Sequence, residues 1–228
     1  MPIKACVFDA YGTLFDVAAA ARILAEQPGQ SQLAEVWPKL AADWRAKQLQ
    51  YTWIRAITGA HVPFWDVTQD GLDWAMEASG LEDPELRETL LALYWELPAY
   101  REVPEMLATL KARGYRTVIL SNGSPDMLDG AVDFAGVRTW LDAVLSVEDV
   151  GIFKPAKAVY DMVGARFETA REEVLFVSSN GWDIASATAY GFRTAWVNRA
   201  VEPMDRLPDT PDHVLEDLSG IPALAGTL

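Results

Sequence analysis

The sequence predicts an α/β protein, a doubly wound and Rossmann-like parallel sheet with an inserted helical cap subdomain. A short apolar run at residues 3–8 stops at polar residues, as a buried parallel strand does at the rim of its sheet. Helical patterns alone follow until about residue 97, and strand and helix patterns then alternate. We therefore expect a Rossmann-like core made of residues 1–16 and 98–228 and a cap made of residues 17–97.

The composition suits a globular protein and argues against several kinds of partner. Of the 228 residues, 50% are hydrophobic and 23% are charged, so the chain can bury a core. There are 33 acidic against 19 basic residues and no basic run, so we expect no nucleic-acid partner. No apolar stretch approaches the ~18 residues of a membrane span, and the chain does not start with a basic and then an apolar segment. We therefore expect no membrane partner and a cytoplasmic location.

Cysteine and histidine chemistry is not expected. Cys6 is the only cysteine and lies in the first strand, where a buried and unreactive thiol is the better interpretation. His61 falls in the predicted cap and His213 in the acidic C-terminal segment. Neither a Ser/His triad nor a histidine metal site is easily assembled from them.

The predicted cap contains four helices with recognisable ends. Acidic residues cap the first and the fourth, a proline stands in the first turn of the second, and a glycine follows the third. These helices are expected from Asp16 to about Pro28, from about Trp37 and Pro38, from Asp66 to Ser79, and from Asp83 onward. Most tryptophans of this segment are expected in the bundle core, with one or two facing a pocket. They are Trp37, Trp44, Trp53, Trp65, Trp74 and Trp95.

The predicted core alternates strands and helices. A helix at residues 104–113 ends at a glycine and leads into a strand at residues 115–120. Further strands are expected at residues 143–147, 174–177 and 194–198, with helices at residues 155–167 and 182–190. Because ligands bind at the carboxyl ends of the strands in such sheets, functional side chains are expected there.

Asp9 follows the first predicted strand directly, within the sequence FDAYGTLFD of residues 8–16. A carboxylate at the rim of such a sheet is a candidate catalytic group rather than a solvated charge. An aspartate followed by glycine and threonine is also typical of an ordinary turn or helix cap. Taken alone, the segment supports the two interpretations about equally.

Three more polar clusters are expected at the same edge of the sheet. They have the sequences LSNGSP at residues 120–125, FKP at residues 153–155 and VSSNGWD at residues 177–183. Each has an ordinary structural alternative, with Ser124 as a helix N-cap, Lys154 as a surface lysine and Asp183 as a first-turn helix residue. Four clusters at one edge, including an aspartate and a lysine, favour a catalytic site.

These motifs, in this order and spacing, resemble those of the haloacid dehalogenase superfamily. Its four motifs are a strand-one aspartate, a strand-two serine or threonine, a lysine and a strand-four acidic cluster. The L-2-haloacid dehalogenases are the most similar members, and the cap sequence WRAKQLQYTW of residues 44–53 is also similar to theirs. The resemblance covers nearly the whole chain. It implies a small halogenated carboxylic acid as substrate and a homodimer.

The resemblance implies hydrolysis of short-chain L-2-haloalkanoic acids to D-2-hydroxy acids, through an aspartyl ester and with inversion at C2. Asp9 is the expected nucleophile, and Lys154 would keep it ionised. Asp183 is the acid expected to orient or deprotonate the water that attacks the ester.

The resemblance also assigns the other residues of the expected site. Arg45 and Asn122 would cradle the halide, and Ser121 with backbone N–H groups would hold the substrate carboxylate. Thr13, Tyr160, Ser178 and Asn180 would complete the polar shell. An apolar wall is expected from Tyr11, Leu49, Phe64 and Trp182.

Two residues favour dehalogenation over phosphate-ester hydrolysis. Phosphatase relatives need an acid two positions after the nucleophile to protonate the leaving alkoxide, but Tyr11 stands there and a halide leaves without a proton. They also need Mg²⁺, held in part by an acid where Ser179 stands. We therefore expect no metal and no cofactor. The alternatives are a Mg²⁺-dependent phosphohydrolase of the same superfamily and a binding protein without catalysis.

Overall fold

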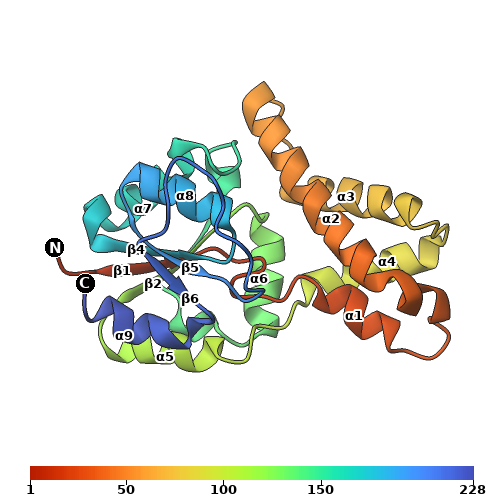
Figure 1. Cartoon of the computed structure of the whole chain (residues 1–228), viewed down its shortest axis with the longest axis horizontal. Helices are drawn as coiled ribbons and strands as arrows, with labels where there is room; N and C mark the ends of the chain where they lie inside the picture. The colour runs from red at the N-terminus through yellow and green to blue at the C-terminus, as the bar shows by residue number, and fades with distance from the viewer.

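The computed structural model describes residues 1–228 and contains one six-stranded sheet with a helical cap beside it (Figure 1). The strand order is β3-β2-β1-β4-β5-β6, and every neighbouring pair is parallel. The strands are β1 (Ala5–Phe8), β2 (Arg116–Ser121), β3 (Ala143–Ser146), β4 (Val174–Ser178), β5 (Arg193–Val197) and β6 (His213–Leu215). The predicted α/β fold with a parallel sheet and a cap is confirmed.

The register of the sheet brings the predicted site segments to one edge. Phe8, the last residue of β1, is opposite Ile119 of β2 and Val177 of β4. All residues of β1 and β4 are buried, as expected for strands covered on both faces. The chain therefore leaves β1, β2 and β4 side by side, and the residues that follow these strands are neighbours.

Five helices belong to the core. They are α5 (Val103–Ala112), α6 (Pro125–Phe134), α7 (Lys157–Phe167), α8 (Gly181–Tyr190) and α9 (Ile221–Ala225). Figure 1 shows α7 and α8 on one side of the sheet and α5 and α9 on the other, as in a doubly wound fold. The cap helices are α1 (Ala19–Ala25), α2 (Ser31–Thr58), α3 (Phe64–Ala78) and α4 (Pro84–Trp95).

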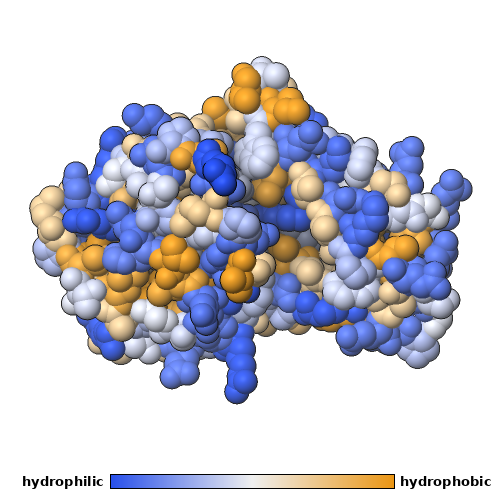
Figure 2. Space-filling view, in the orientation of Figure 1, coloured by the Kyte–Doolittle hydropathy of each residue, from blue (hydrophilic) through white to orange (hydrophobic).

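The cap and the core share one continuous apolar interior, although a hollow separates them at the surface (Figure 2). The two segments that connect them run side by side. Asp16 N–H donates to Pro98 O at 2.9 Å, and Tyr100 N–H donates to Leu14 O at 2.9 Å. These bonds fix where the chain leaves the core and where it returns.

The predicted start of the second cap helix was wrong. The helix α2 begins at Ser31, and Pro38 lies inside it rather than in its first turn. A proline at this position removes the N–H that would bond to the carbonyl of Ala34, and its ring crowds that carbonyl. Leu33 and Leu40, on either side of Pro38, are both buried, so packing keeps the helix continuous through the proline.

The prediction that most cap tryptophans form the bundle core is met only in part: Trp44 belongs to the core, and Trp37, Trp65 and Trp95 pack against it. Only Trp44 is fully buried, and Trp74 is exposed. The remaining four are half-buried: Trp37, Trp53, Trp65 and Trp95. Trp53 meets Trp182 of the core edge to face, with 5.4 Å between ring centroids, because part of the cap faces the core and not the bundle interior. One cap tryptophan thus faces the sheet domain, as predicted.

Among the strands and α-helices, two elements were not anticipated from the sequence, the edge strand β6 and the short helix α9. Strand β6 has only three residues and no buried apolar run, so its pattern is too short to recognise.

No helix combines the length and the apolarity needed to cross a bilayer.

Candidate active site

Asp9 lies at the carboxyl end of the central strand β1 and is only 6% exposed. Its N–H donates to Val177 O at 3.0 Å, which continues the pairing of β1 with β4 by one residue. Gly12 follows with φ +86°, a conformation that favours glycine, and turns the chain back. The Thr13 hydroxyl, one residue later, donates to Asp9 Oδ2 at 3.1 Å.

Donors from three segments surround the two oxygens of Asp9. Lys154 Nζ lies 3.1 Å from Oδ1, and Asn180 Nδ2 donates to Oδ2 at 2.9 Å. The Ser178 hydroxyl lies 3.5 Å from Oδ2 and also accepts from Asn180 N–H at 3.1 Å. These contacts fix the carboxylate in place, and such a fixed orientation would suit a group that attacks along one line.

Lys154 joins Asp9 to a second carboxylate. Its side chain is 1% exposed, and Nζ lies 2.8 Å from Asp183 Oδ2. Asp183 is fully buried in the first turn of α8, and its other oxygen accepts from the Tyr160 hydroxyl at 2.7 Å. The surface-lysine alternative is thus excluded, and Asp183 is more than a helix-capping charge.

The two carboxylates of this cluster favour the charged form of the lysine between them. Burial disfavours the charged ammonium of Lys154, but Asp183 and Asp9 outweigh it and raise its pKa above the ordinary value. Burial raises the pKa of the Asp183 carboxyl, an effect that Lys154 opposes and Asp9 strengthens. Burial and the nearby Asp183 raise the pKa of Tyr160 well above its ordinary value. At neutral pH a permanent cation therefore faces Asp9.

The loop after β2 forms another wall of the site. Asn122 Oδ1 accepts from the backbone N–H of Lys154 at 2.9 Å, and Ser121 Oγ accepts from Gly123 N–H at 3.0 Å. A Cβ on Gly123 would lie 2.6 Å from the ring of Tyr11, so only glycine fits at this close approach. Ser121 and Asn122 are both buried.

The cap contributes a cation and an apolar wall. Arg45 of α2 donates from Nη2 to Tyr11 O at 3.1 Å and to Asn180 Oδ1 at 3.4 Å. Asn180 in turn donates to Asp9, so one residue links Arg45 to Asp9. The Tyr11 ring lies 5.7 Å from that of Phe64, centroid to centroid. The structure thus brings the predicted cap residues Arg45 and Phe64 to the core.

Leu49 and Trp182 are the other two residues of the predicted apolar wall. Leu49 is half-buried on α2, one turn beyond Arg45. Trp182 faces an apolar cavity of about 460 Å³ between the C-terminal half of α2 and the core, lined also by Trp53 and Pro155. Its indole N–H is buried without a partner. Trp182 precedes Asp183 in the chain, so this cavity borders the site.

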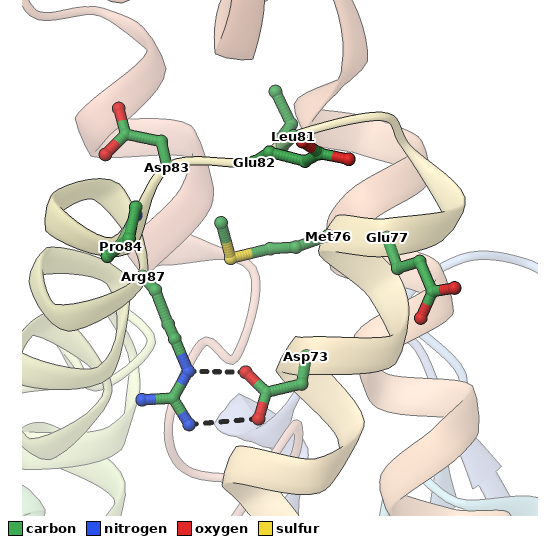
Figure 3. A pocket seen from close by; sticks show the side chains of 8 residues that line it. All are labelled: Asp73, Met76, Glu77, Leu81, Glu82, Asp83, Pro84 and Arg87. Carbon is green, nitrogen blue, oxygen red and sulfur yellow. Dashed lines mark hydrogen bonds and ion pairs between the residues drawn. The ribbon is translucent and has the colours of Figure 1, made fainter.

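A second hollow is unrelated to the charged cluster. It lies at the outer end of the cap, between α3 and α4, where Arg87 pairs with Asp73 (Figure 3). Glu77, Glu82 and Asp83 also line it, which makes it unfavourable for an anionic ligand. None of the predicted site residues lies there.

The histidines and the cysteine take no part in the site. His213 lies in the edge strand β6, and His61 packs on Phe153 with 4.6 Å between ring centroids. Cys6 is buried inside β1, and burial raises the pKa of its thiol to about 12. A reactive thiolate at this position is therefore excluded.

Two residues near Asp9 were missed as site residues. The Ser179 N–H donates to Thr13 Oγ1 at 2.8 Å, which orients the hydroxyl that holds Asp9. Arg199 donates to Thr13 O at 3.1 Å and pairs with Glu102 at 2.7 Å. Arg199 follows β5 at the same edge of the sheet, so the rule used for the other strand ends could have found it.

A helical cap over a Rossmann-like sheet, with a buried lysine between two carboxylates at the strand ends, defines a capped hydrolase with an aspartate as candidate nucleophile. The family model of haloacid dehalogenase-like hydrolases matches residues 3–191. The chain belongs to this family, and within it to the (S)-2-haloacid dehalogenases, with which it shares its whole length.

Three relatives show how close this relationship is. The (S)-2-haloacid dehalogenase 1 of Pseudomonas sp. (strain CBS-3) is 42% identical over 98% of this chain and 96% of that protein. The (S)-2-haloacid dehalogenase of Pseudomonas sp. (strain YL) is 39% identical over 99% and 95%. The solved structure of L-2-haloacid dehalogenase from Xanthobacter autotrophicus with chloropropionic acid covalently bound is 35% identical, with a TM-score of 0.85 over 97% of this chain and 98% of that chain.

Proposed function

We propose that this protein hydrolyses short-chain L-2-haloalkanoic acids to D-2-hydroxy acids through an ester on Asp9. The single observation that carries the proposal is the pairing of the Asp9 carboxylate with the buried Lys154 ammonium at 3.1 Å. It gives an anionic, oriented nucleophile beside a fixed positive charge. The covalently bound chloropropionic acid in the Xanthobacter autotrophicus enzyme supports a covalent route.

In the first step an oxygen of Asp9 attacks C2 of the substrate from the side opposite the halogen. The carbon–oxygen bond forms as the carbon–halogen bond breaks, and the halide leaves with the bonding electrons, which inverts the centre. We assign Arg45 and Asn122 to the departing halide and Ser121 to the substrate carboxylate. The position of Arg45 supports its assignment to the halide. Its guanidinium lies beside Asn180, and Asn180 donates a hydrogen bond to Asp9.

In the second step water attacks the carbonyl carbon of the Asp9 ester. The bond from that carbon to the ester oxygen breaks, the 2-hydroxy acid takes one proton, and the other is released to solvent. Asp183 is the group proposed to orient or deprotonate this water. Its raised pKa and its position across Lys154 from Asp9 support that role.

The remaining predicted residues shape the site. Thr13, Ser178 and Asn180 fix Asp9, and Tyr160 fixes Asp183 through the bonds described above. We propose that Tyr11, Leu49, Phe64 and Trp182 surround the alkyl group of the substrate. Two properties of Tyr11 support this apolar role. Its buried hydroxyl has no hydrogen-bond partner, and burial raises the pKa of Tyr11 well above the ordinary value, so the side chain stays neutral.

No metal is needed for this chemistry, because Lys154 supplies the charge beside Asp9. Tyr11 and Ser179 stand where phosphatase relatives carry acids, and Lys154 lies between the two buried carboxylates that remain. A metal cation at that point would have to displace the ammonium of Lys154.

We further propose that residues 17–97 form the cap domain and that the protein is cytoplasmic. We also propose that it is a homodimer, and light scattering after gel filtration tests this oligomeric state directly.

The proposal is tested by halide release from each enantiomer of 2-chloropropionate, with and without EDTA. A phosphate monoester with and without Mg²⁺ is assayed beside it. We expect chloride from the L enantiomer at the same rate in EDTA, with D-lactate as product. Phosphate release that requires Mg²⁺, without chloride release, would identify a phosphohydrolase. Neither activity would favour a binding protein.

The Arg45→Ala variant should release halide about 10²–10³-fold more slowly than the wild type, because a preorganised cation at the leaving group is lost. The fold should survive, since Arg45 is half-buried and its two bonds are to the core. Chloride release and thermal unfolding measure the two effects. Lys39→Ala, on an exposed position of α2, is the control. Equal rates in both variants would place the halide site elsewhere.

A further inference from the structure

The first turn of the cap helix α3 has no cap of its own. Its N-cap residue is Pro63, whose side chain accepts no hydrogen bond. Two core residues serve instead: Glu148 Oε1 accepts from Phe64 N–H at 3.1 Å, and Ser124 Oγ accepts from Trp65 N–H at 3.2 Å. The Ser124 hydroxyl in turn donates to Glu148. The free N–H groups of a first turn need acceptors, and a carboxylate there is also favoured by the helix dipole.

Glu148 and Ser124 are both anchored at the catalytic edge of the sheet. Glu148 follows β3 and donates its N–H to Ser146 Oγ at 3.2 Å, while the Ser146 hydroxyl donates to Gly123 O at 2.7 Å. Ser124 is buried at the N-cap position of α6, directly after the loop of Ser121 and Gly123. Its side chain does not bond to the first turn of α6, so the structural alternative of a simple helix cap is excluded. Its hydroxyl serves the cap helix instead.

A buried chain of hydrogen bonds leads from this contact to α2. Phe64 O accepts from Thr68 Oγ1 at 2.8 Å, and Thr68 Oγ1 accepts from Gln48 Nε2 at 3.0 Å. Thr68 O accepts from Trp44 Nε1 at 2.8 Å. Trp44 and Gln48 lie on either side of Arg45 in α2, and all four residues of the chain are buried. The position of α3 thus sets the position of Arg45.

We propose that Glu148 is a positioning residue, which caps α3 from the core and thereby places Phe64 and Arg45 against Asp9. The inference rests on the proposed function, because it concerns the step in which these cap residues act. Glu148 touches no reacting atom. It connects the loop that follows β3 to the cap. The distance between Arg45 of the cap and Asp9 of the core therefore stays fixed.

If Glu148 positions the cap, its loss should affect the alkylation of Asp9 and the hydrolysis of the ester differently. Alkylation of Asp9 needs the cap, since Arg45 receives the halide. Hydrolysis of the ester uses Lys154 and Asp183, which belong to the core and do not bond to α3. Loss of Glu148 should therefore slow alkylation and spare hydrolysis, whereas general loosening of the fold would slow both.

The test is a single turnover with excess enzyme and 2-chloropropionate, following chloride release and ester decay separately by rapid quench and intact-protein mass. Glu148→Ala should slow chloride release about 10-fold to 10²-fold, the scale of a misplacement near 1 Å, with ester decay unchanged. Glu148→Gln keeps an acceptor oxygen but not the charge, so it should recover part of the loss. Asp149→Ala, at the exposed neighbouring position, should match the wild type.

Three results would overturn the inference: chloride release in Glu148→Ala equal to that of Asp149→Ala, equal slowing of both steps, or no recovery in Glu148→Gln. If Glu148→Ala does not fold, the step-selective effect must be present in Glu148→Gln, at smaller size. A wild type that releases no chloride would instead refute the proposed function. The two failures are thus distinguishable.

Discussion

Asp9→Asn should abolish halide release, with a loss of about 10⁴-fold or more, because a neutral amide cannot displace halide from carbon. The change is nearly isosteric, and the amide oxygen can still accept the bonds from Thr13 and Asn180. The protein should therefore fold. The measurement is chloride release from L-2-chloropropionate, together with a thermal unfolding curve.

Asp16→Asn is the matched control for this change. Asp16 lies on the same loop, accepts from Ala18 N–H at 3.0 Å and pairs with Arg22, away from the charged cluster. Asparagine can still accept that hydrogen bond, so activity should stay close to the wild type. Substantial turnover in Asp9→Asn would mean that water attacks the substrate directly.

Lys154→Met should show the second large effect, on both stability and rate. Lys154 is the cation between the buried carboxylates of Asp9 and Asp183. Removing one partner of a buried ion pair costs about 3–5 kcal/mol of unfolding free energy, because the remaining charges lose their compensation. Asp9 would also lose the positive charge that lies beside it in the wild type. We expect kcat to fall at least about 10³-fold.

The control for this prediction is Lys157→Met, an exposed lysine three residues later at the start of α7. Urea unfolding gives the stability change and chloride release the rate. A Lys154→Met protein as stable and active as Lys157→Met would show that the buried ammonium supports neither the fold nor Asp9.

The core was the more predictable part of the fold. Strands such as β4, with every residue buried, leave an apolar run that the sequence shows directly. The cap was less predictable because tertiary packing overrode a local signal at Pro38, which α2 accommodates in its interior. The edge strand β6 was missed because a three-residue edge element leaves almost no pattern.

The candidate site was predictable where one rule applied, that polar residues after parallel strands meet at one edge. That rule brought Asp9, Asn122 and Asp183 together before any geometry was known. It said nothing of contacts between distant segments. The capping of α3 by Glu148 could not be inferred from the sequence, because Glu148 and Phe64 are 84 positions apart. The sequence around each of them suggests only a turn.

The central claim is that Asp9 itself becomes covalently attached to the substrate, and one measurement tests it most directly. A single turnover is run in ¹⁸O-labelled water with excess enzyme, and both the product and the Asp9 peptide are analysed by mass. If Asp9 attacks, its own carboxylate oxygen becomes the product hydroxyl, so the first 2-hydroxy acid is unlabelled and ¹⁸O enters Asp9 when the ester is hydrolysed. Label in the first-turnover product with none in the Asp9 peptide would contradict the covalent mechanism.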